Sequence, residues 1–376
     1  MSLKVVHVLS GLGLGGIEKW LVSVSVEMRR LYGDDIQVDF LTFILPDGYF
    51  AAQLKASGFR IYHCQLIWTK FPEFIYRLAS HLLKEHYDVV HCHADYLSGL
   101  VLPVAHAMGV KVRVGHIHNT QFAFQARRPL ARYCAGIVLR RLHIWDGGYC
   151  VGTSMSAIDA YLGDFKRQIF HQVCACGIVC ADYRQVVDRD KLAIIQSLNL
   201  PVDFKFILHV GRHSEQKNLL FLLEILSKVF QSNANVMGIF AGAGPMTGLL
   251  NEKARALGIL DKIHFLGNRD DVPRLMRAAD LFVFPSLYEG LGLAVVEAQM
   301  VGLRSLISEV IPDDVEIIHS LVHRLSLRES STTWAECVLR LIKLPAPDPI
   351  NSLNLVEASQ FNITNSAQTL MALYTK

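Results

Sequence analysis

Residues 281–300 read LFVFPSLYEGLGLAVVEAQM, an order that predicts a strand, a tight turn and a helix. The apolar run 281–284 is typical of a parallel strand that is covered on both faces. Gly290 and Gly292 let the backbone approach a bulky group closely, and a helix is expected to begin near Leu291. The first turn of a helix carries free N–H groups and the positive end of its dipole, so this turn suits an anion such as a phosphate.

The alternation of strands and helices continues along the chain. In the first half, strands are expected at 4–9, 36–43, 59–63, 88–92, 112–116, 146–151 and 169–174. Helices are expected near 17–31, 71–86, 97–107, 128–142 and 155–162. After a polar break at 182–190, the expected strands are 205–210, 236–241, 262–266 and 281–284, and the expected helices are 217–231, 245–257, 271–278, 291–301 and 354–375. This alternation predicts doubly wound parallel sheets.

The length of 376 residues fits two domains, because a domain usually has roughly 100–200 residues. Hydrophobic residues make up 51% of the chain and charged residues 19%, which is typical of a globular protein. We expect an N-terminal domain at 1–180, a C-terminal domain at 181–353 and a terminal helix at 354–376.

The composition excludes several classes of protein. A nucleic-acid-binding protein would usually be more basic than this chain, whose net charge is +3. The sequence contains no apolar stretch of the length that spans a membrane, and its first residues predict a strand rather than a secretory signal. We therefore expect a cytoplasmic protein whose eight cysteines are reduced.

Two carboxylates flank the glycine turn. Glu289 lies in the turn and Glu297 on the helix that follows, and both can accept hydrogen bonds from sugar hydroxyls. The alternative interpretation is a solvated loop acid beside a surface helix acid.

The two glutamates, with seven residues between them, match the signature of the retaining glycosyltransferases of family 4, and the chain resembles that family along most of its length. The other matching segments are His209-Val210-Gly211-Arg212, Lys217-Asn218, Ala241-Gly242-Ala243-Gly244-Pro245, Phe265-Leu266-Gly267 and Gly15-Gly16-Ile17-Glu18. The early Gly-Gly-Ile-Glu and the segment His118-Asn119-Thr120 are most similar to exopolysaccharide-type members. The resemblance implies the GT-B fold, an α/β architecture in which two Rossmann-like, doubly wound parallel-sheet domains face each other across a cleft. It also implies that the terminal helix at 354–376 crosses back to the first domain.

The resemblance also implies an activity. The expected reaction transfers a sugar, with retention of configuration, from a nucleotide-sugar donor that is expected to be UDP-linked. The expected acceptor is a hydroxyl of a saccharide or lipid-linked saccharide in cell-surface polysaccharide synthesis. No metal or other cofactor is expected.

Four side chains are expected to hold the donor. Arg212, as a planar fork, and Lys217, as a point charge, would stabilise the departing diphosphate. Glu289 is expected at the donor sugar and Glu297 at the nucleotide ribose. The other positions expected to contact the nucleotide sugar are Gly15, Gly16, Gly267, Asn268, Gly290, Leu291, Gly292 and Leu293.

Histidines follow two expected strands of the first domain, in His91-Cys92-His93 and His116-Ile117-His118-Asn119. Because ligands bind at the carboxyl ends of strands in open α/β sheets, these side chains are candidates for substrate contact. His118 resembles the active-site histidine of the family and is expected to be catalytic, together with Glu289, Arg212 and Lys217. His93, His116 and Asn119 are expected on the acceptor side. The alternative is a set of structural histidines.

Arginines gather on an expected helix of the first domain, at Arg127, Arg128, Arg132, Arg140 and Arg141. One interpretation is peripheral contact with the anionic inner face of the cytoplasmic membrane, which suits an enzyme that builds on a lipid carrier. The other is an ordinary solvated surface.

Three alternative functions remain to be tested. The segment Gly11–Gly16 satisfies the dinucleotide-binding fingerprint of an oxidoreductase, but that motif requires an acid at the end of the second strand, and Asp39 lies inside this strand. A nucleotide-sugar epimerase of the same fold and a non-catalytic sugar-nucleotide-binding protein are the other two.

Two segments could suggest a metal. His171, Cys174, Cys176 and Cys180 lack a second Cys-x-x-Cys pair, and Asp188-Arg189-Asp190 follows no strand, so we expect no metal site at either segment. Cys176-Gly177-Ile178-Val179 and Leu303-Arg304 depart from the family pattern.

Overall fold

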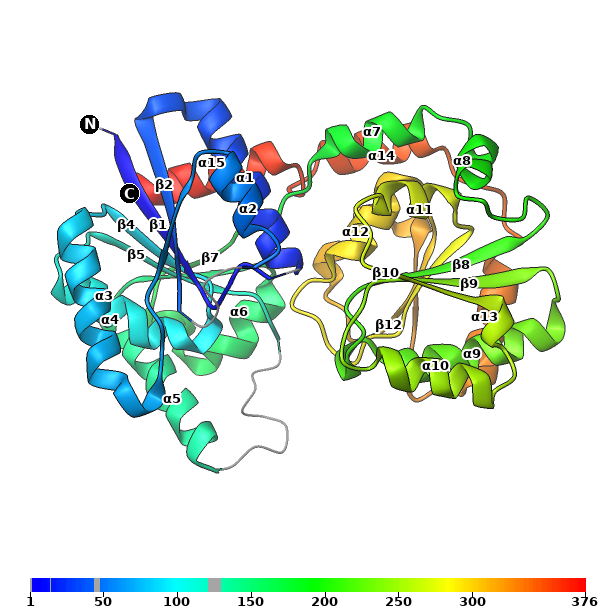
Figure 1. The fold of residues 1–376 in the computed structure, drawn as a ribbon, viewed down its shortest axis with the longest axis horizontal. Coiled ribbons are helices and arrows are strands. Elements are labelled where there is room, and N and C mark those ends of the chain that lie inside the picture. The colour runs from blue at the N-terminus through cyan, green and yellow to red at the C-terminus, as the bar shows by residue number, and fades with distance from the viewer. Residues whose placement is uncertain (1, 14, 44–47, 121–129) are drawn as a thin grey trace. The chain divides into compact units, whose positions relative to one another are not determined.

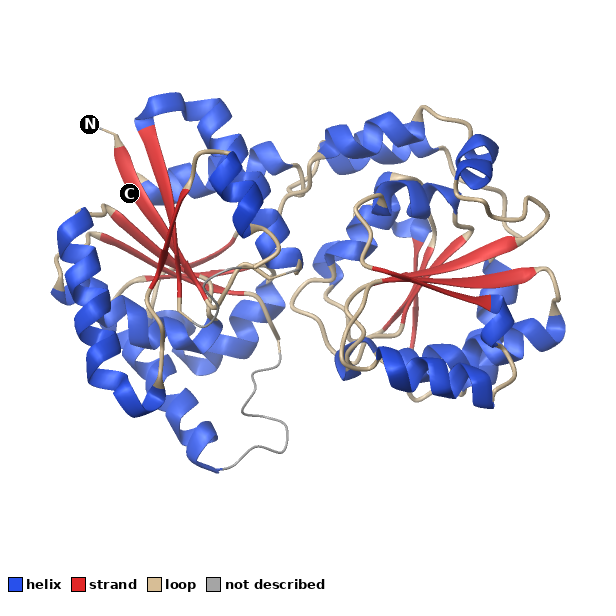
Figure 2. Cartoon of the chain, viewed as in Figure 1, coloured by secondary structure: helices blue, strands red, loops and turns tan. Residues whose placement is uncertain are grey.

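The computed structural model describes residues 2–13, 15–43, 48–120 and 130–376, with the side chains of 130–133 excepted. The chain divides into two compact units, each an α/β unit around one sheet (Figures 1 and 2). The first unit comprises Met1–Ile178 and Ile363–Lys376, and the second comprises Val179–Asn362.

The first unit contains a seven-stranded sheet in the order β3-β2-β1-β4-β5-β6-β7, and every pair is parallel. Its strands are β1 (Leu3–Leu9), β2 (Ile36–Thr42), β3 (Arg60–His63), β4 (Val89–Cys92), β5 (Val112–Ile117), β6 (Tyr149–Gly152) and β7 (His171–Val173). Its helices are α1 (Gly16–Tyr32), α2 (Ala51–Ala56), α3 (Phe71–Glu85), α4 (Ser98–Ala107), α5 (Leu130–Asp146), α6 (Met155–Leu162) and α15 (Ile363–Tyr374).

The second unit contains a six-stranded parallel sheet in the order β10-β9-β8-β11-β12-β13. Its strands are β8 (Lys205–Val210), β9 (Val236–Ala241), β10 (Ile263–Gly267), β11 (Leu281–Phe284), β12 (Ser305–Ser308) and β13 (Val322–Leu325). Its helices are α7 (Cys180–Val187), α8 (Lys191–Ser197), α9 (Leu219–Ser232), α10 (Thr247–Ala256), α11 (Val272–Ala278), α12 (Leu293–Met300), α13 (Ser331–Leu341) and α14 (Pro349–Glu357). The expected doubly wound α/β class is confirmed for both units.

The core of each unit lies between its sheet and the covering helices. In the first unit, Val6 and Val90 of the sheet pack with Leu78 and Leu102. In the second, Trp334 of α13 is completely buried in the cluster that α9, β8 and β9 form. Fully buried strands explain why the sequence shows continuous apolar runs instead of an alternating pattern.

The terminal segment differs from the expected single helix, because it forms α14 and α15. α14 belongs to the second unit and α15 to the first, where it packs on α1 (Figure 1). Ser366 connects α15 to two other segments of the first unit by hydrogen bonds. Its hydroxyl accepts a hydrogen bond of 3.1 Å from the Trp20 indole and donates one of 2.6 Å to the carbonyl of Ala175.

Other expectations for the second unit were wrong or incomplete. The expected polar break holds α7, whose Tyr183, Val186 and Val187 are buried at helical spacing, and then α8. α12 begins at Leu293 instead of near Leu291, since Gly292 has a φ of 95°, which a helix does not permit. β12, β13 and α13 were not predicted.

Candidate active site

Three loops of the second unit meet at the carboxyl ends of β8, β9 and β11. The loop after β8 bonds to the loop after β9, since the amide of His213 donates to the carbonyl of Ala243 over 3.2 Å. It also bonds to the loop after β11, since the amide of Leu287 donates to the carbonyl of Gln216 over 2.8 Å. The three loops therefore form one connected structure at the sheet edge where ligands bind in this class of fold.

Glycine is required where these loops cross. A Cβ on Gly242 would lie 2.0 Å from the carbonyl oxygen of Gly211, and the φ of Gly242 is 137°. A Cβ on Gly244 would lie 2.4 Å from the carbonyl oxygen of His213. Both neighbouring atoms belong to the backbone and cannot rotate away, so the two glycines allow an approach that other residues would prevent.

Lys217 and Glu289 form an ion pair within this structure. Lys217 Nζ lies 2.5 Å from Glu289 Oε1 and 4.6 Å from the centre of the Phe284 ring. The side-chain amide of Gln216 donates to Glu289 Oε2 over 3.2 Å and to the carbonyl of Tyr288 over 2.9 Å. Only 7% of Glu289 is exposed, so both of its carboxylate oxygens are held in a largely dry position.

The other residues of this unit that were predicted to bind the nucleotide sugar lie in these loops or in neighbouring elements. Arg212 is exposed in the loop after β8, and Glu297 is half-buried on α12. Burial, and then the neighbouring Glu297 carboxylate, raise the pKa of Tyr183 well above its ordinary value. Gly267 ends β10 with a φ of 65°, and Asn268, which follows it, is exposed. The segment Gly290–Leu293 leads into α12.

The first unit contains a buried histidine layer, formed by His7 of β1, His91 and His93 of β4 and its end, and His116 and His118 of β5 and its end. His7 Nδ1 lies 2.9 Å from His93 Nε2, and His93 Nδ1 lies 3.0 Å from His118 Nε2. His91 Nε2 lies 3.1 Å from His116 Nδ1. Successive hydrogen bonds therefore connect imidazoles across three neighbouring strands.

Burial keeps this layer uncharged. It lowers the pKa of His7 and of His118 to about 3, and it lowers the pKa of His91, His93 and His116 well below the ordinary value. His93 is 6% exposed, His118 is 5% exposed and His116 is not exposed at all, so the three predicted histidines belong to one buried layer.

Asp95 holds the loop after β5 and was not predicted to take part in the site. One oxygen of its carboxylate accepts from the His118 amide over 2.8 Å, and the other accepts from the Asn119 side chain over 3.0 Å. Asp95 has a φ of 48°, a conformation that aspartate tolerates better than most residues. Asp95 also begins a short 3-10 turn, Asp95–Leu97.

Gly15 and Gly16 begin α1 in the same unit. Gly15 is the residue before the helix and Gly16 its first residue. A Cβ on Gly15 would lie 2.3 Å from a carboxylate oxygen of Glu18, whereas a Cβ on Gly16 would meet open space. There is therefore free space beside the Cα of Gly16, whereas the Glu18 carboxylate occupies the space beside the Cα of Gly15.

Comparisons with known proteins agree along the chain. The family described as Glycosyl transferases group 1 matches residues 190–353, and the Glycosyl transferase 4-like domain matches residues 15–144. EpsF of Bacillus subtilis strain 168, described as a glycosyltransferase, is 32% identical over 353 residues, which cover 90% of this chain and 87% of EpsF. This chain belongs to glycosyltransferase family 4.

Two further proteins are similar to this family 4 glycosyltransferase. The Escherichia coli UDP-Gal:α-D-GlcNAc-diphosphoundecaprenol α-1,3-galactosyltransferase is 27% identical over 241 residues, which cover 61% of this chain and 59% of that enzyme. The crystal structure of Anabaena HepE in complex with UDP-glucose superposes with a TM-score of 0.77 at 18% identity, covering 99% of both chains. The predicted GT-B fold is confirmed.

Asp39 has a structural role in this glycosyltransferase. Its carboxylate accepts from Arg60 over 3.0 and 2.6 Å and from the hydroxyl of Tyr87 over 2.9 Å. A dinucleotide-dependent oxidoreductase would need such an acid for a ribose, and these partners occupy it. The glycosyltransferase interpretation is therefore preferred over the oxidoreductase.

Among the described residues, the cysteine cluster does not bring three metal-ligating atoms together. Cys174, Cys176 and Cys180 are buried and form no disulfide with another described cysteine. The groups of metal-ligating atoms that come within 4.8 Å of one another in the described part of the chain belong to the histidine layer. The side chain of Asp190 instead accepts from the amide of Leu192 at the start of α8.

The predicted arginine face lies only partly within the described residues. Arg127 and Arg128 lie outside the described residues, as does the side chain of Arg132. Arg140 donates to the carbonyl of Tyr161 over 3.2 Å. Arg141 is exposed together with three apolar side chains, Val138, Leu142 and Trp145. Among the described helices, none is long and apolar enough to cross a membrane.

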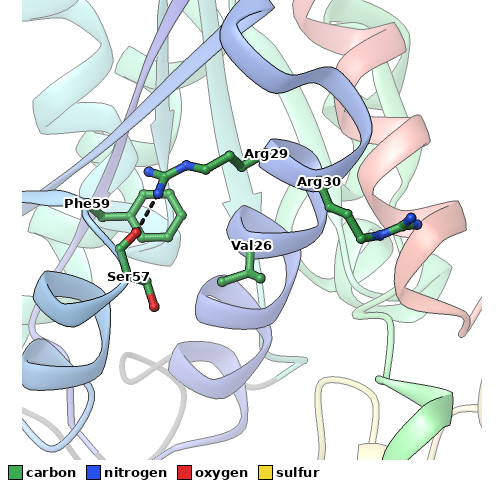
Figure 3. A pocket seen from close by; sticks show the side chains of 5 residues that line it. All are labelled: Val26, Arg29, Arg30, Ser57 and Phe59. Carbon is green, nitrogen blue, oxygen red and sulfur yellow. Dashed lines mark hydrogen bonds between the residues drawn. The ribbon is translucent and has the colours of Figure 1, made fainter.

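A shallow hollow on the first unit lies apart from the predicted site residues (Figure 3). It is lined by Val26, Arg29, Arg30, Ser57 and Phe59. The Arg29 guanidinium lies 3.8 Å from the centre of the Phe59 ring and donates to the carbonyl of Ser57. These contacts satisfy Arg29 and tie α1 to the segment before β3.

Proposed function

We propose that this family 4 glycosyltransferase moves a hexose from a UDP-linked donor to a hydroxyl of a lipid-linked saccharide in cell-surface polysaccharide synthesis. The observation that carries the proposal is the Lys217–Glu289 pair at the ends of the adjacent strands β8 and β11. The pair offers a cation for a diphosphate and, beside it, a carboxylate for sugar hydroxyls. The donor of the proposal is supported by HepE, solved with UDP-glucose, and the acceptor by the Escherichia coli relative, whose name specifies UDP-Gal and a diphosphoundecaprenol-linked sugar.

Donor binding changes the partner of Lys217 in this proposal. Negative charge builds on the diphosphate as its bond to the sugar breaks, and Lys217 and the exposed Arg212 stabilise that charge. Lys217 exchanges a Glu289 oxygen for a phosphate oxygen, and that carboxylate oxygen then accepts from the sugar hydroxyls. The two cations fulfil the role that a metal ion has in other transferases, so the reaction is metal-independent.

The proposed transfer retains the configuration at the anomeric carbon. The acceptor hydroxyl attacks from the face that the diphosphate leaves, so the new C–O bond forms as the C–O bond to phosphate breaks. A departing phosphate oxygen takes the acceptor proton. No enzyme nucleophile is needed.

The remaining contacts follow from the loops around the pair. Glu297 holds the ribose, and the backbone at Gly267 and Asn268 lines the base. The amides of Gly290–Leu293, at the start of α12, face the phosphate and the sugar. In the first unit, Gly15, Gly16 and His118 act on the transferred sugar, and Asn119 on the acceptor.

We also propose that α5 contacts an anionic membrane, where a lipid-linked acceptor is found. Arg141 supplies positive charge, and Val138, Leu142 and Trp145, which is 77% exposed, supply apolar surface on the same side of the helix. Charge combined with exposed apolar side chains is the combination that holds a helix at a bilayer surface.

A panel of nucleotide sugars, each incubated with undecaprenyl-diphosphate-linked saccharides, tests the function. We expect mass spectrometry to find one UDP-sugar that extends an acceptor by one hexose, and NMR to find the anomeric configuration of the donor in the product. Lys217→Ala should strongly reduce the amount of product under the same conditions. Interconversion of the donor sugar without transfer would instead indicate an epimerase, and binding without any product would indicate a sugar-nucleotide-binding protein.

A further inference from the structure

The histidine layer contains two separate chains of hydrogen bonds. The first chain runs from His7 through His93 to His118. The second runs from the hydroxyl of Tyr374 on α15 through His91 to His116. In the first chain both end atoms, His7 Nε2 and His118 Nδ1, are buried and have no hydrogen-bond partner in the described part of the structure. The first chain therefore has two open ends.

The ring nitrogens that meet in the first chain allow only two arrangements of its protons. A neutral imidazole carries one N–H and one bare nitrogen. If His7 donates from Nδ1, then His93 must donate from its own Nδ1, and His118 keeps its proton on the free Nδ1. If His118 donates from Nε2, every proton moves to Nε2, and the free N–H lies on His7. The three rings therefore share one tautomer.

We propose that His93, and His7 through it, are positioning residues that fix the tautomer of His118 so that its Nδ1–H donates to an oxygen of the bound nucleotide sugar. The inference rests on the proposed function, because it assumes that His118 contacts the donor. The oxygen is a sugar hydroxyl or a phosphate oxygen, both of which accept hydrogen bonds.

A bound oxygen favours one of the two arrangements. Without a ligand, either arrangement leaves one buried N–H without an acceptor, at His118 or at His7, which costs free energy. An oxygen at His118 Nδ1 removes this cost when all three protons lie on Nδ1, because only the bare Nε2 of His7 then stays unpaired. The donor is therefore expected to select the Nδ1–H form of all three rings.

The same histidines could also be considered as metal ligands, and the distances favour the proton chain. The three imidazole pairs are separated by 2.9, 3.0 and 3.1 Å, which are hydrogen-bond lengths. No carboxylate belongs to the ligand groups found in the described layer, so a cation there would be held by neutral ligands only.

The test uses the full chain labelled with 15N in the histidine rings, with and without UDP and UDP-glucose. We expect the rings of His7, His93 and His118 to share one tautomer in every sample and to carry Nδ1–H when UDP-glucose is bound. This readout does not require turnover, so it can succeed or fail independently of the proposed reaction. Different tautomers within the chain would overturn the inference, and so would Zn²⁺ binding at one equivalent with loss of the N–H signals.

Activity variants provide the second readout. His93→Phe keeps a ring but breaks the chain, and it should lower kcat about tenfold, as expected when one hydrogen bond in the transition state is lost. The KM for the acceptor should stay unchanged. His93→Gln can accept from His7 with its oxygen and donate to His118 with its amide, so it should recover most of the lost rate.

His91→Phe is the matched control, because it breaks the Tyr374–His91–His116 chain at a similarly buried position and leaves the first chain intact. A lower melting temperature without a change in kcat is expected for this variant. Equal loss of kcat in His91→Phe and His93→Phe, or no rescue by His93→Gln, would assign the layer a structural role only. Wild-type kcat in His118→Ala would also overturn the inference.

Discussion

Lys217 Nζ lies 2.5 Å from Glu289 Oε1, and Gln216 donates to the other oxygen of the same carboxylate over 3.2 Å. Lys217 and Gln216 both come from the loop after β8, and Glu289 comes from the loop after β11. Because this arrangement already holds Lys217 in place, little side-chain freedom is lost when a phosphate replaces the carboxylate.

Removal of the Lys217 ammonium should reduce turnover strongly. We expect Lys217→Ala to lower kcat/KM by an amount equivalent to about 2–4 kcal/mol of transition-state stabilisation, and Arg212→Ala to have an effect in the same direction. Lys205→Ala is the matched control, since Lys205 lies at the other end of β8 and pairs with Asp280 over 3.2 Å. Steady-state kinetics at varied donor concentration measures these effects. Equal rates for Lys217→Ala and Lys205→Ala would refute the assigned diphosphate site.

The crossing of the loops after β8 and β9 should tolerate no side chain. Gly242→Ala forces a Cβ against the backbone of Gly211, so we expect it to destabilise the second unit by roughly 1–3 kcal/mol or to prevent its folding. Gly248→Ala on α10 meets nothing within 4 Å and should stabilise the protein by roughly 0.5–1 kcal/mol. Urea unfolding compares the two variants. A Gly242→Ala protein as stable as the wild type would mean that the loops are not packed as described.

Chelation should leave the transfer reaction intact. Since Arg212 and Lys217 supply the positive charge at the diphosphate, we expect the same initial rate before and after dialysis against EDTA. A galactosyltransferase or glucosyltransferase with a known metal requirement serves as the positive control for the treatment. Loss of activity that Mn²⁺ or Mg²⁺ restores would contradict the proposed chemistry.

Acid should destabilise the first unit through the histidine layer. Burial lowers the pKa of His7 and His118 to about 3 and that of His91, His93 and His116 well below 6.5, their ordinary value. The unfolded chain therefore binds more protons below about pH 6.5, so the stabilisation is complete above that pH and is lost progressively towards about pH 3. Each histidine contributes up to about 1.4 kcal/mol per pH unit within that window.

Urea unfolding between pH 7.5 and pH 5 tests this dependence. The free energy of unfolding should decrease as the pH is lowered. The slope of this free energy against pH should be shallower for His91→Phe, because one titrating ring has been removed. An identical slope in wild type and variant would indicate that the buried rings do not contribute. A rise in stability on acidification would contradict the sign of the argument.

The sequence predicted those parts of the fold that have continuous apolar runs. The run 281–284 and its turn predicted both a strand of the second sheet and the Glu289 loop, since a strand that is buried on both faces is hard to mistake for another element. β12 reads SLIS and β13 reads VHRL, and the polar residues in both strands interrupt the apolar pattern. α7 was missed because its exposed charges hid the buried spacing of Tyr183, Val186 and Val187.

The site was predictable where motifs named residues and not where contacts depend on packing. Lys217 and Glu289 were both expected at the donor, but their direct pairing required the loops to meet. Spacing placed His93 and His116 at strand ends, and only the packing of α1, whose Trp20 contacts both rings, shows that they are buried. Asp95 carries no motif, because its role comes from the position of a loop 23 residues further along the chain.

A crystal structure of the full chain with UDP-glucose tests the account most directly. It should show a phosphate oxygen within about 3 Å of Lys217 Nζ, as for a charge-assisted hydrogen bond, and the carboxylate of Glu289 turned to the glucose hydroxyls. Gly290–Leu293 should face the diphosphate in the same complex. Lys217 still paired with Glu289, and UDP-glucose bound away from the loops after β8 and β11, would contradict the account.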